Sequence, residues 1–402
     1  MSKKFAIVAA LLFLVNEARA ELIFGRVVDH LGNGVPGVDI DVLNEGSGGD
    51  PEVFNDGTDP NGFFSTTVSA FGVFNIEFNA PPPGVITVLS VSVNDVLVVG
   101  SVNLGTIVLP PGVALSGRVI DDLGFPVANI NLDVIDQATG SRLITPFDRT
   151  DLFGNFTIGV PTVPIEVRFD ATPVVIPILA SKRILLSPTV DLNIGDLQLE
   201  PGVIVSGNVR TTGGAPVDGA DLDFTDSTSQ ERAYTPHDNT DEFGNFLVVV
   251  PLGTYDVQVC PVAGQLLVSE EIDNVPLLVD ASLGIINLEP GFILSGTVTH
   301  ANGTPAAGID IDVEISATGS TIALCVDNTN GAGFYSVIVP IGTFNLTFTQ
   351  RCAGPSVRQE RLFNVLVTGN QTQNASLPSG PCSREAGSTP RIFGHSVDAP
   401  LF

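Results

Sequence analysis

The sequence predicts an all-β chain of four tandem antiparallel β-sandwich domains, each about 90 residues long. Three observations support this fold class. Val and Ile, which favour strands, are frequent, and 42 Gly and 29 Pro supply turns between them. Apolar residues alternate with Asp or Asn in each copy, which indicates half-buried strands. One acidic motif occurs four times: DGTDPNGFF at 56–64, DRTDLFGNF at 148–156, DNTDEFGNF at 238–246 and DNTNGAGFY at 327–335.

Each copy opens with a short strand centred on a glycine, and the copies share one register from there to the acidic motif. The motif starts 31 residues after its own glycine in all four copies. Length differences between copies are therefore confined to the second half of the repeat. The opening glycines, spaced by 92, 90 and 89 residues, are Gly25, Gly117, Gly207 and Gly296.

A second strand follows a turn that contains Gly and Pro. Side chains alternate between the two faces of a strand, so its apolar residues face a core and its acidic residues face solvent. This alternation is typical of an antiparallel sheet with one solvated face. The strand sequences are GVDIDV at 37–42, NINLDV at 129–134, GADLDF at 219–224 and GIDIDV at 308–313.

Two further strands follow the motif and are predicted to form a hairpin. The first starts at the aromatic residue that ends the motif, as in FTIGVP, and the second alternates apolar and polar residues, as in IEVRF. A last strand ends at LPPG, LEPG, LEPG or LPSG. We expect roughly seven strands per copy. Almost no linker joins the copies, which predicts an elongated string with the domains 21–112, 113–202, 203–291 and 292–380.

The two ends of the chain differ from the repeats. Residues 1–20 contain two early lysines, an apolar run and a small-x-small cleavage site, which predict a secretory signal peptide. No later segment approaches the roughly 18 unbroken apolar residues of a membrane helix. Residues 381–402 break the repeat pattern, and we expect them to be disordered. A truncated fifth repeat is the alternative, because RIFGHSVD in this tail resembles IFGRVVD in the first copy.

The charge balance excludes some partners. The chain has 17 Lys and Arg against 44 Asp and Glu, a formal charge of −27, and removal of residues 1–20 leaves 14 basic and 43 acidic residues. Such a chain repels nucleic acid and anionic membranes. We expect a secreted protein of the extracellular space, the cell surface or the periplasm, without membrane insertion.

Several ordered motifs resemble a known family. SGRVID or SGTVTH, then NINLDV or GIDIDV, TDxFGNF and VPxGTYDVQV together resemble the carboxypeptidase regulatory-like domain, a transthyretin-like sandwich, over residues 21–380. The resemblance implies a fold and not a function, since this domain is an accessory module in many exported proteins. A weaker resemblance is to the collagen-adhesin B-type stalk domains, some of which carry Lys–Asn cross-links. The mature chain has one lysine, Lys182, so at least three copies lack such a cross-link.

The acidic motif has two interpretations. As a turn, its Asp and Thr cap backbone N–H groups, its Gly takes a positive φ and its aromatic residue returns to the core. As a metal loop, it would offer Ca²⁺ two carboxylates per copy, with a third from the second strand, Asp41, Asp133 or Asp223. We favour the turn, because the sequence contains no complete calcium-ligand pattern. We therefore expect that the protein requires no cofactor, with Ca²⁺ as the alternative. The candidate Ca²⁺ ligands are Asp56, Asp59, Asp148, Asp151, Asp238 and Asp241, whereas Asn330 weakens any site in the fourth copy.

The four cysteines lie in the second half of the chain. In an oxidising compartment they can form two disulfides in three connectivities. Cys325 and Cys352 fall within one repeat and are the expected pair. Four unpaired buried thiols are the alternative. The other two cysteines are Cys260 and Cys382.

Motifs for catalysis are missing from the sequence, which has no HExxH, GxSxG, GxxxxGK[ST] or CxxC. The four histidines occupy unrelated repeat positions. We therefore expect a non-enzymatic, exported spacer, adhesin or interaction scaffold with a protein or polysaccharide partner. One alternative is a carbohydrate-binding protein, for which Tyr234 is the free aromatic candidate. The second is a Ca²⁺-dependent assembly module.

Overall fold

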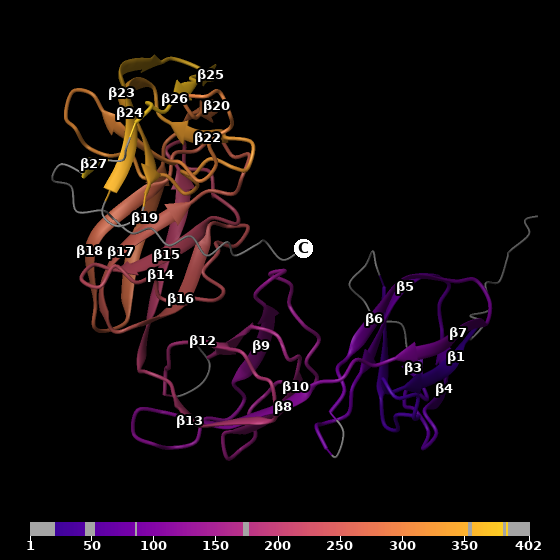
Figure 1. Cartoon of the computed structure of the whole chain (residues 1–402). Helices are drawn as coiled ribbons and strands as arrows, with labels where there is room; N and C mark the ends of the chain where they lie inside the picture. The colour runs from indigo at the N-terminus through magenta and orange to yellow at the C-terminus, as the bar shows by residue number, and fades with distance from the viewer. Residues whose placement is uncertain are drawn as a thin grey trace, which may run out of the picture. The chain divides into compact units, whose positions relative to one another are not determined.

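A computed structural model of the 402-residue chain describes residues 21–44, 53–84, 87–171, 177–352, 356–380 and 383–384. The predicted signal peptide and nearly all of the predicted disordered tail lie outside these residues. In the described part of the chain every long regular element is a strand. None of it forms a helix long and apolar enough to cross a membrane. Figure 1 labels most of the strands, which follow one another in groups along the chain.

The described chain forms two compact units. The first contains the stretch up to Val119 together with Pro126–Arg168 and Ile184–Leu197. The second contains Ile120–Phe125, Phe169–Arg183 and the chain from Gln198 onward. Repeat 1 thus belongs to the first unit and repeats 3 and 4 to the second. The predicted domain limits, which differ from this division, stay a prediction.

Each repeat is a sandwich of two small sheets, as repeat 1 shows. One sheet has the strand order β3-β4-β1-β7 and the other β2-β5-β6. The strands alternate buried and exposed residues, as their sequences predict. They are β1 (Glu21–Val28), β2 (Asp39–Asn44), β3 (Val53–Phe54), β4 (Phe63–Val68), β5 (Gly72–Asn79), β6 (Val91–Val98) and β7 (Val102–Val108).

Repeats 2 and 3 repeat this plan with six described strands each. Repeat 2 has sheets β10-β8-β13 and β12-β11-β9, and repeat 3 has β16-β14-β19 and β15-β17-β18. Repeat 2 comprises β8 (Val113–Ile120), β9 (Asn131–Asp136), β10 (Asn155–Val160), β11 (Ile165–Asp170), β12 (Lys182–Leu186) and β13 (Leu192–Gln198). Repeat 3 comprises β14 (Gly202–Thr211), β15 (Asp221–Asp226), β16 (Asn245–Pro251), β17 (Gly253–Cys260), β18 (Glu270–Leu277) and β19 (Ala281–Leu288).

Repeat 4 has the same two sheets with a divided last strand. Both short pieces of this strand, β25 and β26, pair with β20, and the other sheet has the order β21-β23-β24-β27. The strands are β20 (Phe292–Thr299), β21 (Asp310–Ile315), β22 (Phe334–Val339), β23 (Gly342–Arg351), β24 (Ser356–Val367), β25 (Gln371–Thr372), β26 (Ala375–Ser376) and β27 (Ser383–Arg384).

The expectation of purely antiparallel sheets needs one correction. The first and last strands of a repeat are parallel neighbours, as in β1 with β7, β14 with β19 and β20 with β25. The opening glycine lies in this pair: a Cβ on Gly25 would be 2.7 Å from Gly105 O. Glycine is therefore needed where the last strand approaches closely.

The first strand of each repeat also pairs with the strand that follows the acidic motif, as β1 does with β4. This pairing explains the fixed spacing between the opening glycine and the motif. Gly25 is the cross-strand partner of Phe64, and Gly207 is the partner of Phe246. Each aromatic ring packs over its glycine, which has no side chain to exclude it. Gly117 with Phe156 and Gly296 with Tyr335 repeat the arrangement.

The predicted hairpin after the motif is wrong. Its two strands, for example β16 and β17, belong to different sheets of the sandwich. Both strands carry buried residues that face the same core from opposite sides. Pro251 ends β16 and has no N–H to donate across a tight hairpin, which favours the crossing to the second sheet.

Separate apolar cores support the individual sandwiches. The cluster of repeat 1 includes Phe78, that of repeat 3 includes Phe224 and that of repeat 4 includes Phe348, all three fully buried. Burial of one such side chain stabilises a domain by about 1.5–3 kcal/mol. Each of these clusters is confined to residues of one repeat, so the sandwich is the packing unit.

Candidate functional sites in the turns and at the junctions

A buried threonine anchors each acidic motif. In repeat 3, Thr240 Oγ1 donates a hydrogen bond to Val217 O at 2.7 Å and accepts one from Ala220 N at 2.8 Å. These threonines are only 3–9% exposed. The hydroxyl therefore ties the motif to the turn that starts the second strand. The same two bonds, at the same sequence offsets, are made by Thr58, Thr150 and Thr329.

The second acidic residue caps the turn. Asp241 Oδ1 accepts hydrogen bonds from Phe243 N at 2.9 Å and Asn245 N at 2.7 Å. The backbone hydrogen bond from Asn245 lowers the pKa of Asp241 below its ordinary value. Gly244 has φ of 78°, and a Cβ there would collide with Val209 O. Asp59, Asp151 and Asn330 accept the equivalent two bonds.

The first acidic residue interacts with the second strand of its repeat. Burial, followed by the charge of Asp133, raises the pKa of Asp148. Burial, followed by the charge of Asp221, raises the pKa of Asp238 to about 7. Thr235 Oγ1 donates a hydrogen bond to Asp238 Oδ2 at 2.6 Å. In repeats 2 and 3 the two acidic residues of the motif thus have opposite environments, the first half-buried or buried and the second exposed. In repeat 1 both Asp56 and Asp59 are exposed.

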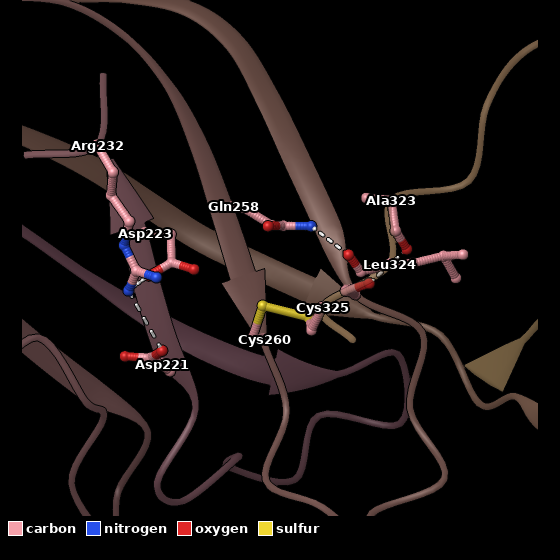
Figure 2. The surroundings of a disulfide bond; sticks show 9 residues. Asp221, Asp223, Arg232, Gln258, Cys260, Ala323, Leu324 and Cys325 are labelled. Carbon is pink, nitrogen blue, oxygen red and sulfur yellow. Dashed lines mark hydrogen bonds and ion pairs between the residues drawn. A yellow bond between two sulfur atoms is a disulfide. The ribbon is translucent and has the colours of Figure 1, made fainter. Parts of the chain in front are cut away.

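An arginine lies among these carboxylates in two copies. Arg142 Nη2 is 2.5 Å from Asp133 Oδ1 and 4.0 Å from Asp148 Oδ2. In repeat 3, Arg232 forms ion pairs with Asp221, at 3.8 Å, and with Asp223, as Figure 2 shows. In repeats 2 and 3, a guanidinium is therefore already paired with Asp133 or Asp223, two of the three strand carboxylates that the sequence suggested as third calcium ligands.

Among the described residues, the group of three acidic side chains with carboxylate oxygens within 4.8 Å of one another is Asp256, Glu271 and Asp273, on β17 and β18. None of them belongs to the acidic motif. In repeat 1, Asp41 Oδ2 accepts a hydrogen bond from Asn79 Nδ2 at 2.7 Å. Calcium binding by the motifs stays a prediction. Melting temperatures in EDTA and in millimolar Ca²⁺, with Mg²⁺ as the control, would test it.

The same short β-bridge holds the linker that follows each of the first three repeats. At the first junction, Leu89 N donates to Pro110 O at 2.9 Å and Gly112 N donates to Thr87 O at 3.0 Å. The linker is therefore held on both sides of its central proline by the preceding repeat. The other junctions have the same two bonds, Ala180 to Glu200 with Gly202 to Ile178, and Val268 to Glu289 with Gly291 to Leu266.

A disulfide reinforces the third junction. Cys260 ends β17 of repeat 3 and bonds to Cys325 in the loop between β21 and β22 of repeat 4, with 5.7 Å between the Cα atoms. Gln258 Nε2 donates to Leu324 O at 3.1 Å, and Ser269 Oγ donates to Ala323 O at 2.5 Å. Figure 2 shows Gln258 and Cys260 on one strand, opposite the segment 323–325. Repeats 3 and 4 are thus linked covalently as well as by hydrogen bonds.

The expected disulfide between Cys325 and Cys352 is wrong. Cys325 is bonded to Cys260, 65 residues away, and Cys352 is itself in a disulfide. The described cysteines include no free thiol, and Cys382 lies outside the described residues. Spacing within one repeat gives no signal for a bond between two repeats.

No family model matches the chain. Solved structures match it over much of its length. The Bacillus anthracis TIE protein is 13% identical, with 90% of this chain and 74% of that chain covered and a TM-score of 0.21. A streptococcal ancillary pilin is 9% identical, with 66% and 99% covered and a TM-score of 0.20. BcpA, the major pilin subunit of Bacillus cereus, is also 9% identical over 66% and 99%, with a TM-score of 0.18. The transthyretin-like family stays a prediction.

The aromatic candidate for sugar binding is engaged in other contacts. Tyr234 donates from its hydroxyl to Asp170 Oδ1 at 2.8 Å. The guanidinium carbon of Arg183 lies 5.8 Å from the centre of the Tyr234 ring. These contacts join repeat 3 to the segment Phe169–Arg183 within the second unit. Tyr234 is therefore a contact residue between segments and not a free platform.

A cavity in repeat 4 has no counterpart in the sequence motifs. It measures about 450 Å³ and lies beside β24, with Arg358, Arg361 and Phe363 in its wall. The sequence signal is a local change in charge: residues 351–380 contain three arginines and one acidic residue, Glu360, in an otherwise acidic chain.

Proposed function

We propose that the protein is a non-enzymatic, exported spacer that holds its surfaces at fixed separations for a protein or polysaccharide partner. The observation that carries this proposal is the β-bridge at all three junctions. A flexible linker leaves its backbone groups to water, whereas here the linker bonds to the preceding sandwich. Each bridge fixes the linker on the repeat that precedes it.

The disulfide supports both the spacer role and export. Cys260–Cys325 fixes the third junction covalently. Disulfides persist in secreted and surface proteins and are rare in reducing compartments. Placement outside the cell is therefore the proposal that fits the oxidised cysteines and the signal peptide predicted in residues 1–20.

Small-angle X-ray scattering on residues 21–380 tests the spacer function. A compact chain of this size has a radius of gyration of roughly 21 Å. We expect a value well above this and almost no change between low and moderate salt, because the bridges do not depend on charge. A radius near the compact value would refute the spacer.

A double variant separates the two kinds of junction contact. Cys260→Ser with Cys325→Ser removes the disulfide and leaves the three bridges intact. We expect scattering close to that of the unmodified chain if the bridges alone keep the repeats apart. A collapse of the variant would assign the separation to the disulfide instead.

Carbohydrate binding is a second candidate function. The cavity beside β24 favours it, because concave sites with an aromatic wall and a few polar groups are typical of small-ligand binding.

A further inference from the structure

The cavity beside β24 has the composition of an anion site. Its wall is formed by Arg358, Gln359, Arg361 and Phe363 of β24 and by Pro378 and Ser379. Its volume of about 450 Å³ falls in the range of small-molecule pockets, roughly 300–1,000 Å³.

Arg358 lacks a counter-charge in the described part of the chain. Its Nη1 donates to Gln350 Oε1 at 3.0 Å and its Nη2 donates to Gly380 O at 2.6 Å. Both acceptors are neutral, and the buried Nε has no hydrogen-bond partner among the described residues. A partly buried guanidinium is normally matched by a carboxylate or another anion. An anionic ligand in the cavity would supply this charge.

Arg361 adds a second cation with donors to spare. Its Nη2 bonds to Glu314 Oε2 at 2.9 Å, which occupies one of its five N–H groups. Its guanidinium carbon lies 5.5 Å from the centre of the Phe363 ring. The Phe363 side chain is 63% exposed, so part of the ring is open to a ligand. A flat, partly apolar ligand can therefore pack on the ring while its acidic group contacts the arginines.

We propose that this cavity binds a carboxylate-bearing sugar, the uronic acid residue of an acidic polysaccharide. Arg358 and Arg361 face the carboxylate, and Phe363 packs against the sugar ring. Gln359 Nε2 donates to Thr349 Oγ1 at 3.1 Å, which leaves its carbonyl oxygen to accept from a sugar hydroxyl. The Ser379 hydroxyl completes the polar wall.

The acidic character of the whole chain does not oppose this site. Residues 292–380 carry five acidic and three basic side chains, whereas residues 203–291 carry fourteen acidic and two basic. Charges further away than about 8 Å are largely screened at physiological ionic strength. Within that distance Glu314 pairs with Arg361, so Arg358 is the cation of the cavity wall without a counter-charge among the described residues.

Isothermal titration calorimetry of residues 21–402 tests the proposal. The probes are a trisaccharide of galacturonic acid, the neutral trisaccharide of galactose and tri-glutamate. We expect binding of galacturonate that weakens as NaCl is raised. Arg361→Gln and Phe363→Ala should each weaken it by about tenfold or more, and the two other probes should bind at least about tenfold more weakly.

Two variants control for folding and for nonspecific surface effects. Leu366→Ala removes a side chain of the same strand that is 61% exposed and does not line the cavity, and it should leave binding unchanged. Arg358→Lys keeps the positive charge and should retain part of the binding. Equal binding of neutral galactose or of tri-glutamate would overturn the sugar acid as the ligand. Galacturonate binding that is absent, or insensitive to Arg361→Gln in a folded variant, would overturn the site. The scattering test of the spacer does not depend on either result.

Discussion

At the scale of single residues, the threonine of the acidic motif stabilises each sandwich from a position with almost no solvent contact. In repeat 2, Thr150 Oγ1 accepts from Ile130 N and donates to Val127 O. Thr150→Val keeps the shape of the side chain but leaves both backbone groups unpaired. We expect the free energy of unfolding, measured in urea, to fall by about 1–3 kcal/mol. Thr157→Val, on the exposed side of β10, should change it by less than about 0.5 kcal/mol, and equal effects would contradict the role of the buried hydroxyl.

Asp238 predicts a pH dependence of stability. Burial, and then the charge of Asp221, raise its pKa from 3.8 to about 7 in the folded state. Between about pH 4 and 7 the folded protein therefore binds a proton that the unfolded chain releases, so the contribution of Asp238 to stability decreases as the pH rises. We expect Asp238→Asn to remove this decrease. The difference in melting temperature, variant minus unmodified protein, should therefore increase from pH 4.5 to pH 7.5.

The capping residue of the same motif provides a control of opposite sign. Its backbone hydrogen bond from Asn245 lowers the pKa of Asp241, so its contribution is present at neutral pH and is lost as the pH falls through the folded-state pKa. Asp241→Asn should therefore lower the melting temperature most at neutral pH. A constant difference for Asp238→Asn across the pH window would contradict the raised pKa.

At the scale of strands and linkers, the junction glycine connects the β-bridge to the next sheet. A Cβ on Gly202 would lie 2.5 Å from Val249 Cγ1 and 3.0 Å from Ala180 N. Gly202→Ala should therefore destabilise the second unit by about 1–3 kcal/mol and speed proteolysis within the linker at 199–203. Gly213→Ala is the matched control, because its nearest neighbour, Thr211 Oγ1, is at 3.6 Å. Equal cleavage of the two variants would show that the bridge does not hold the linker.

The sequence was sufficient for those elements whose signals are local. The alternation in GADLDF predicted β15. The fixed offset after the opening glycine was also visible in the sequence, but the pairing of Gly207 with Phe246 that explains it was not predicted. The parallel first and last strands were not predicted, because strand direction depends on how many times the chain crosses between sheets. The position of Arg232 among carboxylates was also missed, since it follows from the pairing of Thr225 with Arg232 and not from spacing.

At the scale of the molecule, the disulfide between repeats 3 and 4 makes their unfolding interdependent. A bond across 65 residues lowers the entropy of the unfolded chain and contributes about 4 kcal/mol in the chain-entropy model. We expect Cys260→Ser with Cys325→Ser to lower the stability of these repeats by up to this amount, as measured by scanning calorimetry. Peptide mapping without reduction should recover the Cys260–Cys325 peptide, and recovery of a different pair would contradict the structure.

This bond also gives mechanical load a second path through the protein. When the two ends of the chain are pulled apart, tension that reaches Cys260 passes through the sulfur atoms to Cys325 and bypasses the residues between them. That segment contains β18, β19, β20 and β21, so two sandwiches each keep part of their sheets out of the loaded path. At about 3.4 Å per extended residue, 65 residues hold back roughly 220 Å of chain. An oxidised molecule is therefore shorter at full extension than a reduced one. While the disulfide is intact, pulling does not extend the residues between Cys260 and Cys325, where repeats 3 and 4 meet.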